Sequence, residues 1–157
     1  MPSLIPSWAP NVHPLVVHFP IVLVLAAAAV DLLAAFLRRP GGFGAAAVAG
    51  YVLGAMAAVV AYVTGSAGAV TVLIPGMAHG LVADHRRWAF VTTWYLVALV
   101  AARLLAETIG ILRARPYRAI FVALGLAGAV LVHQTAERGG RLVYEQGVGV
   151  IRTTGDR

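Results

Sequence analysis

Cysteine and lysine are absent from this 157-residue chain, and charged residues make up only 11% of it. The lack of cysteine excludes disulfides, thiolate metal sites, iron–sulfur ligation and covalent attachment of c-type haem by this chain. Histidine is therefore the only strong ligand left for a transition metal or a haem iron. Soluble domains carry roughly 25% charged residues, so the composition, with 61% hydrophobic residues, indicates a membrane protein.

All twelve basic residues are arginines, and most of them flank long apolar runs. Arginines in such places anchor helix ends at the membrane interface, and no basic aromatic stripe for stacking bases accompanies them. We therefore expect a lipid bilayer as the partner and no nucleic acid. No positively charged region precedes the first apolar run, so we expect no cleavable signal peptide.

Four apolar segments are long enough to cross the hydrocarbon core of a bilayer, which takes roughly 20 helical residues. They cover about residues 14–37, 43–64, 85–111 and 117–136. Pro14 suits a first helical turn, and Asp84 is the expected N-cap of the third helix. The links RRPGG and RARP are short, so neighbouring helices should be antiparallel. The sequence thus predicts an all-α fold, an integral membrane bundle of four transmembrane helices.

A glycine-rich tail, GGRLVYEQGVGVIRTTGDR, follows the fourth segment. We expect Gly139 and Gly140 to end the last helix, which divides the chain into a transmembrane domain, 1–138, and a C-terminal tail, 139–157. Gly147 and Gly149 allow backbone turns that other residues resist. The apolar residues of the tail either cover the histidines as a lid or dock on a partner subunit, and the sequence leaves both open.

Small residues recur every four positions in the second segment, so neighbouring helix backbones can approach closely there. They are Ala46, Gly50, Gly54 and Ala58. Gly65 and Gly68 lie farther along, at the level of the histidines. Helix termination is their expected role, and room for a flat ligand is the alternative.

Two charged residues lie inside apolar segments, Asp31 in the first and Arg103 in the third. The two helices should run in the same direction, which places both side chains at similar depth. An unpaired charge in a membrane costs several kcal/mol, so we predict an Asp31–Arg103 ion pair with a structural role. Glu107 lies one helical turn beyond Arg103 and can share it.

Five histidines fall on one side of the bilayer by helix alternation alone: His13, His18, His79, His85 and His133. Pro20 cannot donate a hydrogen bond to the carbonyl of Val16, so the first helix should kink beside His18. In a compact bundle His18, His85 and His133 are predicted to converge from three helices.

Two imidazoles across a bundle can ligate b-type haem, whereas three or four can hold copper or zinc. We expect His18 and His85 as the axial pair, with His133 and His13 as substitutes. For copper the same set, His18, His85 and His133, would provide the ligands. The alternative is that these histidines only lie among lipid headgroups, like the Trp and Tyr residues of the interface.

Three stretches resemble a bacterial membrane family known as domain of unknown function 2231: HPLVVHFPI, HRRWA and GGRLVYEQGVGV. The resemblance covers nearly the whole chain and implies a four-helix protein of the bacterial inner membrane. Relatives fused to c-type haem or Rieske-type domains imply respiratory or photosynthetic electron transfer. By this resemblance His13, His18 and His85 match recurring histidine positions, and His133 matches less clearly.

The leading hypothesis is therefore a small membrane-bound electron-transfer protein, or subunit, that binds b-type haem through histidines at one membrane face. The alternative is a cofactor-free structural or accessory subunit of a larger respiratory or photosynthetic complex. No nucleophile–base pair or phosphate loop is found, so we do not expect an enzyme. The distribution of arginines favours both termini on the outer side.

Overall fold

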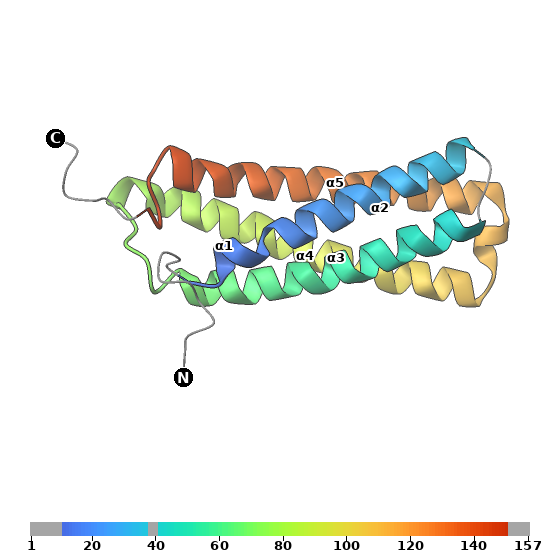
Figure 1. Cartoon of the computed structure of the whole chain (residues 1–157), viewed down its shortest axis with the longest axis horizontal. Helices are drawn as coiled ribbons and strands as arrows, with labels where there is room; N and C mark the ends of the chain where they lie inside the picture. The colour runs from blue at the N-terminus through green and yellow to red at the C-terminus, as the bar shows by residue number, and fades with distance from the viewer. Residues whose placement is uncertain (1–10, 38–40, 151–157) are drawn as a thin grey trace.

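The computed structural model describes residues 11–37 and 41–150. Four long helices run up and down in a single elongated bundle (Figure 1). Short 3-10 helices, η1 and η2, lie in two of the links. In chain order the elements are α1 (His13–Val16), α2 (His18–Phe36), α3 (Gly41–Gly68), η1 (Gly76–Ala78), α4 (His79–Thr108), η2 (Ile111–Arg113) and α5 (Arg115–Tyr144). Within these described ranges there is no strand, so the predicted all-α fold is confirmed.

Four helical stretches are long and apolar enough to cross a membrane: His13–Phe36, Gly42–Gly68, Gly76–Thr108 and Arg115–Tyr144. The bundle turns large apolar side chains outward, as a lipid-facing surface requires. Phe36 is 82% exposed, and Phe19 and Val22 are also exposed. The predicted number of spans is confirmed.

The first span is interrupted at Val17, between α1 and α2. Pro14 lies in the first turn of α1, and the N–H of Val17 donates to the carbonyl of His13 at 3.2 Å. Pro20 follows three residues later and has no N–H to continue the helical ladder from Val16. The predicted disturbance beside His18 is seen as this break at Val17, although Val17 itself keeps helical dihedral angles, φ −61° and ψ −25°.

Three helix boundaries differ from the sequence prediction. α4 begins at His79 rather than at His85, so Asp84 lies within the helix and is not its N-cap. α3 continues past Gly65 to Gly68. α5 continues through Gly139 and Gly140 to Tyr144, so these glycines do not end the helix, and the tail begins later than residue 139. In α3 and α5 the rings of His13 and His85 pack on Gly65 and Gly139, and this packing outweighs the low helix propensity of glycine.

The core is made largely of small residues, which lets α2 and α3 lie close together. A methyl group added to Gly54 would lie 2.7 Å from Cγ2 of Val24, and one added to Gly50 would lie 2.9 Å from Cβ of Ala27. Ala58 is also buried. Ala46 is exposed, so the small-residue face predicted for α3 is correct except at that position.

The glycine-rich segment after α5 caps the helix. The N–H of Val148 donates to the carbonyl of Leu142 at 2.9 Å, and the N–H of Gly147 donates to the carbonyl of Val143 at 3.1 Å. Gly147 has the left-handed φ of 64° that this cap requires, a geometry found at many helix C-termini. The turn-forming role predicted for Gly147 is confirmed, and the cap keeps Leu142 buried.

Candidate functional site

His13 reaches from α1 onto the end of α3. Its Nδ1 lies 3.0 Å from the carbonyl oxygen of Ala61. The ring rests on Gly65, where a methyl group would lie only 2.8 Å from Cε1 of the imidazole. The hydroxyl of Thr64 lies 3.5 Å from the same Nδ1. Glycine at position 65 therefore leaves room for this histidine rather than terminating the helix.

His85 makes the same kind of contact between α4 and α5. Its Nδ1 lies 3.1 Å from the carbonyl oxygen of Thr135. The ring rests on Gly139, where a methyl group would lie 3.2 Å from Cε1. In both cases the accepting carbonyl lies four residues before the glycine, which is one helical turn.

The hydrogen bonds fix the tautomer of both rings. A carbonyl oxygen can only accept, so Nδ1 of His13 and of His85 carries the proton. In a neutral imidazole the other nitrogen, Nε2, then holds a free lone pair. Histidines that bind metals are commonly oriented in this way, with the far ring nitrogen donating to a backbone carbonyl.

The other three histidines do not join this pair. His18 begins α2, His79 begins α4, and His133 lies on α5; all three are exposed. The convergence predicted for His18, His85 and His133 is therefore wrong, because His18 and His133 point away from the interior. Within residues 11–37 and 41–150, no group of three or more His, Asp or Glu side chains is placed to hold a metal ion.

A polar network lies beside His85 at the same end of the bundle. Arg138 of α5 donates from Nε to Asp84 of α4 at 2.6 Å. Its guanidinium lies over the ring of Trp88, 4.3 Å from the ring centroid, a favourable cation–π distance. These contacts join α4 to α5 on the turn that carries His85.

Two threonines strengthen the same junction deeper in the bundle. The hydroxyl of Thr92, which is buried, lies 2.8 Å from the hydroxyl of Thr135 and donates to the carbonyl of Leu131 at 3.2 Å. Thr135 therefore serves both neighbours, its carbonyl accepting from His85 and its side chain meeting Thr92.

Asp31 and Arg103 form the predicted ion pair. Nη2 of Arg103 donates to Oδ1 of Asp31 at 2.8 Å, and Nη1 bonds to Oδ2. Both residues are buried, at 5% and 7% exposure. Nε of Arg103 lies 3.8 Å from Glu107, as the shared arrangement required.

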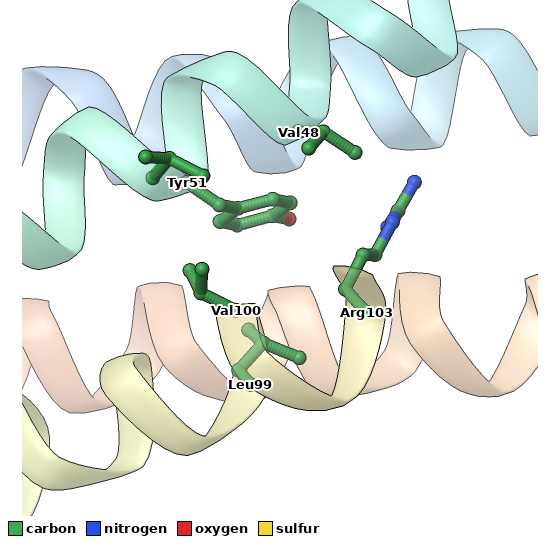
Figure 2. Close-up of a pocket in the computed structure, with 6 residues that line it drawn as sticks. Val48, Tyr51, Leu99, Val100 and Arg103 are labelled. Atoms are coloured by element: carbon green, nitrogen blue, oxygen red, sulfur yellow. The ribbon is translucent and has the colours of Figure 1, made fainter. Parts of the chain in front are cut away.

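Arg103 is the point where all four long helices meet. Its guanidinium lies 5.9 Å from the ring centroid of Tyr51 on α3 and 5.7 Å from that of Phe121 on α5. Figure 2 shows Arg103 rising from α4 beside Val48 and the ring of Tyr51. The space among these side chains is too small to hold a water molecule.

The histidines could be predicted from the sequence, but the groups that orient them could not. The acceptors are backbone carbonyls, of Ala61 and Thr135, which leave no mark in the amino-acid types. Gly65 and Gly139 are evident in the sequence, but glycine near a helix end more often terminates the helix than makes room for an imidazole ring. The alternative for Gly65, room for a flat ligand, stays a prediction, and the flat group that lies beside Gly65 is the ring of His13.

The family described as "Predicted membrane protein (DUF2231)" matches residues 9–152 of the chain. No curated protein matches the chain. No solved structure matches it either.

Proposed function

The chain belongs to the DUF2231 family of membrane proteins, and we propose that it is a small electron-transfer protein or subunit whose b-type haem is ligated by His13 and His85. The observation that carries the proposal is the shared orientation of these rings. Each Nδ1–H is bound to a backbone carbonyl, so each Nε2 is free for iron. α1, which carries His13, and the start of α4, which carries His85, lie toward the same end of the bundle (Figure 1).

The residues present suit this group chemically. Haem iron accepts two neutral imidazoles, and the iron would supply a one-electron couple. His13 and His85 would hold it, and the carbonyls of Ala61 and Thr135 would keep their Nε2 atoms deprotonated and fixed in direction. Arg138 would place positive charge near His85. This charge would favour the reduced state of the haem and would attract the haem propionates.

The test is a visible spectrum of the protein purified in mild detergent after haem supplementation. Wild-type protein should give Soret and α bands that shift on dithionite reduction in the manner of bis-imidazole haem. His13→Ala and His85→Ala should each lose the six-coordinate spectrum. His18→Ala and His133→Ala are matched controls on the exposed surface and should leave it unchanged. A colourless wild-type protein would remove the haem from this proposal.

The second candidate is a cofactor-free accessory subunit of a larger membrane redox complex. It is favoured by the fact that both histidines already join helices through their Nδ1 bonds, a role that needs no ligand. Stoichiometric co-purification with a large partner, without haem or copper by elemental analysis, would support it. Stoichiometric copper would instead replace haem as the metal of the histidine pair.

We place the protein in the bacterial inner membrane with the histidine end outside. The arginines of the opposite end, such as Arg115 and Arg118 at the start of α5, support this orientation by the positive-inside rule. Labelling of single cysteines, introduced at exposed Gly76 or Arg115 in intact cells, tests it cleanly because the native chain has no cysteine. A membrane-impermeant reagent should reach the first site and not the second.

A further inference from the structure

The two helix hairpins, α2–α3 and α4–α5, repeat the same contacts at a constant offset. Asp31 and Arg103 are 72 residues apart. The same offset relates His13 to His85 and Val24 to Leu96. In the second helix of each hairpin the offset is 74, which relates Ala61 to Thr135 and Gly65 to Gly139. The difference of two residues lies in the link between the helices.

Within each hairpin, equivalent residues make equivalent contacts. His13 bonds to the carbonyl of Ala61 and rests on Gly65; His85 bonds to that of Thr135 and rests on Gly139. Deeper in the bundle, Gly54 faces Val24, and the corresponding Gly128 faces Leu96. Both Val24 and Leu96 are fully buried.

Between the hairpins, residues at equivalent positions meet each other. Asp31 is bonded to its equivalent, Arg103. Tyr51 packs its hydroxyl against its equivalent, Gly125. His13 and its equivalent, His85, hold matching places at the same end of the two hairpins, each against a carbonyl and a glycine of the following helix. Contact between a residue and its own equivalent is the mark of a two-fold axis.

The sequence carries a trace of the same repeat. Asp-Leu-Leu-Ala at 31–34 corresponds to Arg-Leu-Leu-Ala at 103–106. In α3 and α5, Gly54-Ala55 corresponds to Gly128-Ala129. The helices that correspond, α2 with α4 and α3 with α5, run in the same direction (Figure 1), so the axis must run along the bundle.

We infer that the chain is two tandem copies of one helix hairpin, related by a pseudo-two-fold axis that passes between Asp31 and Arg103 at one end and between His13 and His85 at the other. The two histidines then form one symmetric site on the axis, which offers two equivalent Nε2 donors to a single metal ion or haem iron. This inference rests on the proposed function for the identity of the ligand. The axis itself does not depend on it.

Eighteen residues separate His85 from Arg103 along α4, about 27 Å of helix at 1.5 Å per residue. The symmetric histidine site and the ion pair therefore lie near opposite faces of a membrane about 30 Å thick. The ion pair makes the two halves unlike at one end. At the other end the two histidines are alike, whereas Arg138 and Asp84 beside His85 correspond to Thr64 and Val12 in the first hairpin.

The first test needs no ligand. The double variant His13→Cys, His85→Cys is treated in detergent with a short thiol-specific cross-linker, and an intramolecular link is detected by mass spectrometry of the digested chain. The native chain has no cysteine to interfere. The matched control, His18→Cys with His133→Cys, places the thiols on the outside. We expect a link in the first pair and none in the control; no link in the first pair would overturn the axis.

The second test uses haemin as the probe. His13→Gly and His85→Gly should give the same five-coordinate spectrum, and added imidazole should restore the same six-coordinate spectrum to both. Wild-type haem binding with unlike spectra in the two variants would overturn the equivalence of the ligands while the proposed function stands. Cross-linking at 13 and 85 without any haem uptake by the wild type would uphold the axis and overturn the proposed function.

Discussion

Arg103 and Asp31 are bonded at two points across the interior of the bundle, and no other buried side chain there carries a full charge among the described residues. The pair joins α2 to α4, while the rings of Tyr51 and Phe121 flank the guanidinium from α3 and α5. One residue from each long helix thus contributes to a single junction. Its energetic weight can be measured because each partner can be removed separately.

Asp31→Asn should destabilise the protein by about 3–5 kcal/mol, because it leaves Arg103 buried without its counter-charge. Replacing both partners, with Asp31→Leu and Arg103→Met, should restore most of this loss, since two apolar side chains of similar size need no pairing. Thermal unfolding in one detergent, followed by size-exclusion chromatography, measures both. A double variant less stable than Asp31→Asn would show that the pair does more than neutralise its own charges.

Tyr51 gives a prediction of the opposite sign. Its hydroxyl is buried and has no hydrogen-bond partner in the described part of the chain. A buried unsatisfied polar group costs about 1–3 kcal/mol, so Tyr51→Phe should leave stability unchanged or raise it by about 1 kcal/mol. A clear loss of stability would mean that the hydroxyl has a partner, such as a water molecule.

Gly125 is the other half of that contact. A methyl group on Gly125 would overlap the hydroxyl of Tyr51, so Gly125→Ala should destabilise the bundle by about 1–3 kcal/mol, the usual cost of overpacking. Tyr51→Phe in the same chain should recover part of the loss, because it removes the nearest overlapping atom. Full additivity of the two changes in thermal unfolding would contradict this close approach.

The cap of α5 depends on one backbone angle. Gly147→Ala places a side chain at φ 64°, which costs roughly 1–2 kcal/mol for a residue other than glycine. The loss should be local, and increased amide exchange of Val148, whose N–H donates to Leu142, reports it. Gly80→Ala is the control: no described atom lies within 4 Å of the added methyl group, and it should not alter exchange at the cap.

The sequence was sufficient for features that depend on composition and depth. Long apolar segments predicted the spans, and the matched depth of Asp31 and Arg103 predicted their pairing because a lone buried charge is costly. Pro20 predicted the break beside His18. The inward-facing histidine could not be predicted in this way. Whether His13 or His18 faces the interior depends on how α1 is set relative to α2 at that break. Five residues of helix turn through about 140°, so His13 and His18 face different sides, and the break at Val17 lies between them.

The predicted ends of α3 and α5 were wrong for a related reason. Glycine at 65 and 139 has low helix propensity, but the imidazoles of His13 and His85 fill the space beside these residues and hold the next turn in place. Only the tertiary contacts reveal that the histidine rings pack against these glycines. The offset of 72 and 74 residues between the hairpins was present in the sequence, yet few identical residues mark it, and the contacts make it plain.

The last prediction concerns Gly65 and Gly139, the glycines against which the two histidine rings pack. Gly65→Ala would place a methyl group 2.8 Å from the ring of His13, and Gly139→Ala would place one 3.2 Å from that of His85. Each should displace its ring, and Gly65→Ala should do so more strongly because its contact is tighter. Haem affinity by titration with haemin should fall in the order wild type, Gly139→Ala, Gly65→Ala.

Neighbouring Gly140→Ala is the control for Gly139: its methyl group meets only Tyr144, at 4.0 Å. Alanine is the better helix former by roughly 0.5–1 kcal/mol, so this control should be at least as stable as the wild type and bind haem equally well. Equal affinity in all four proteins would show that the rings need no glycine beneath them.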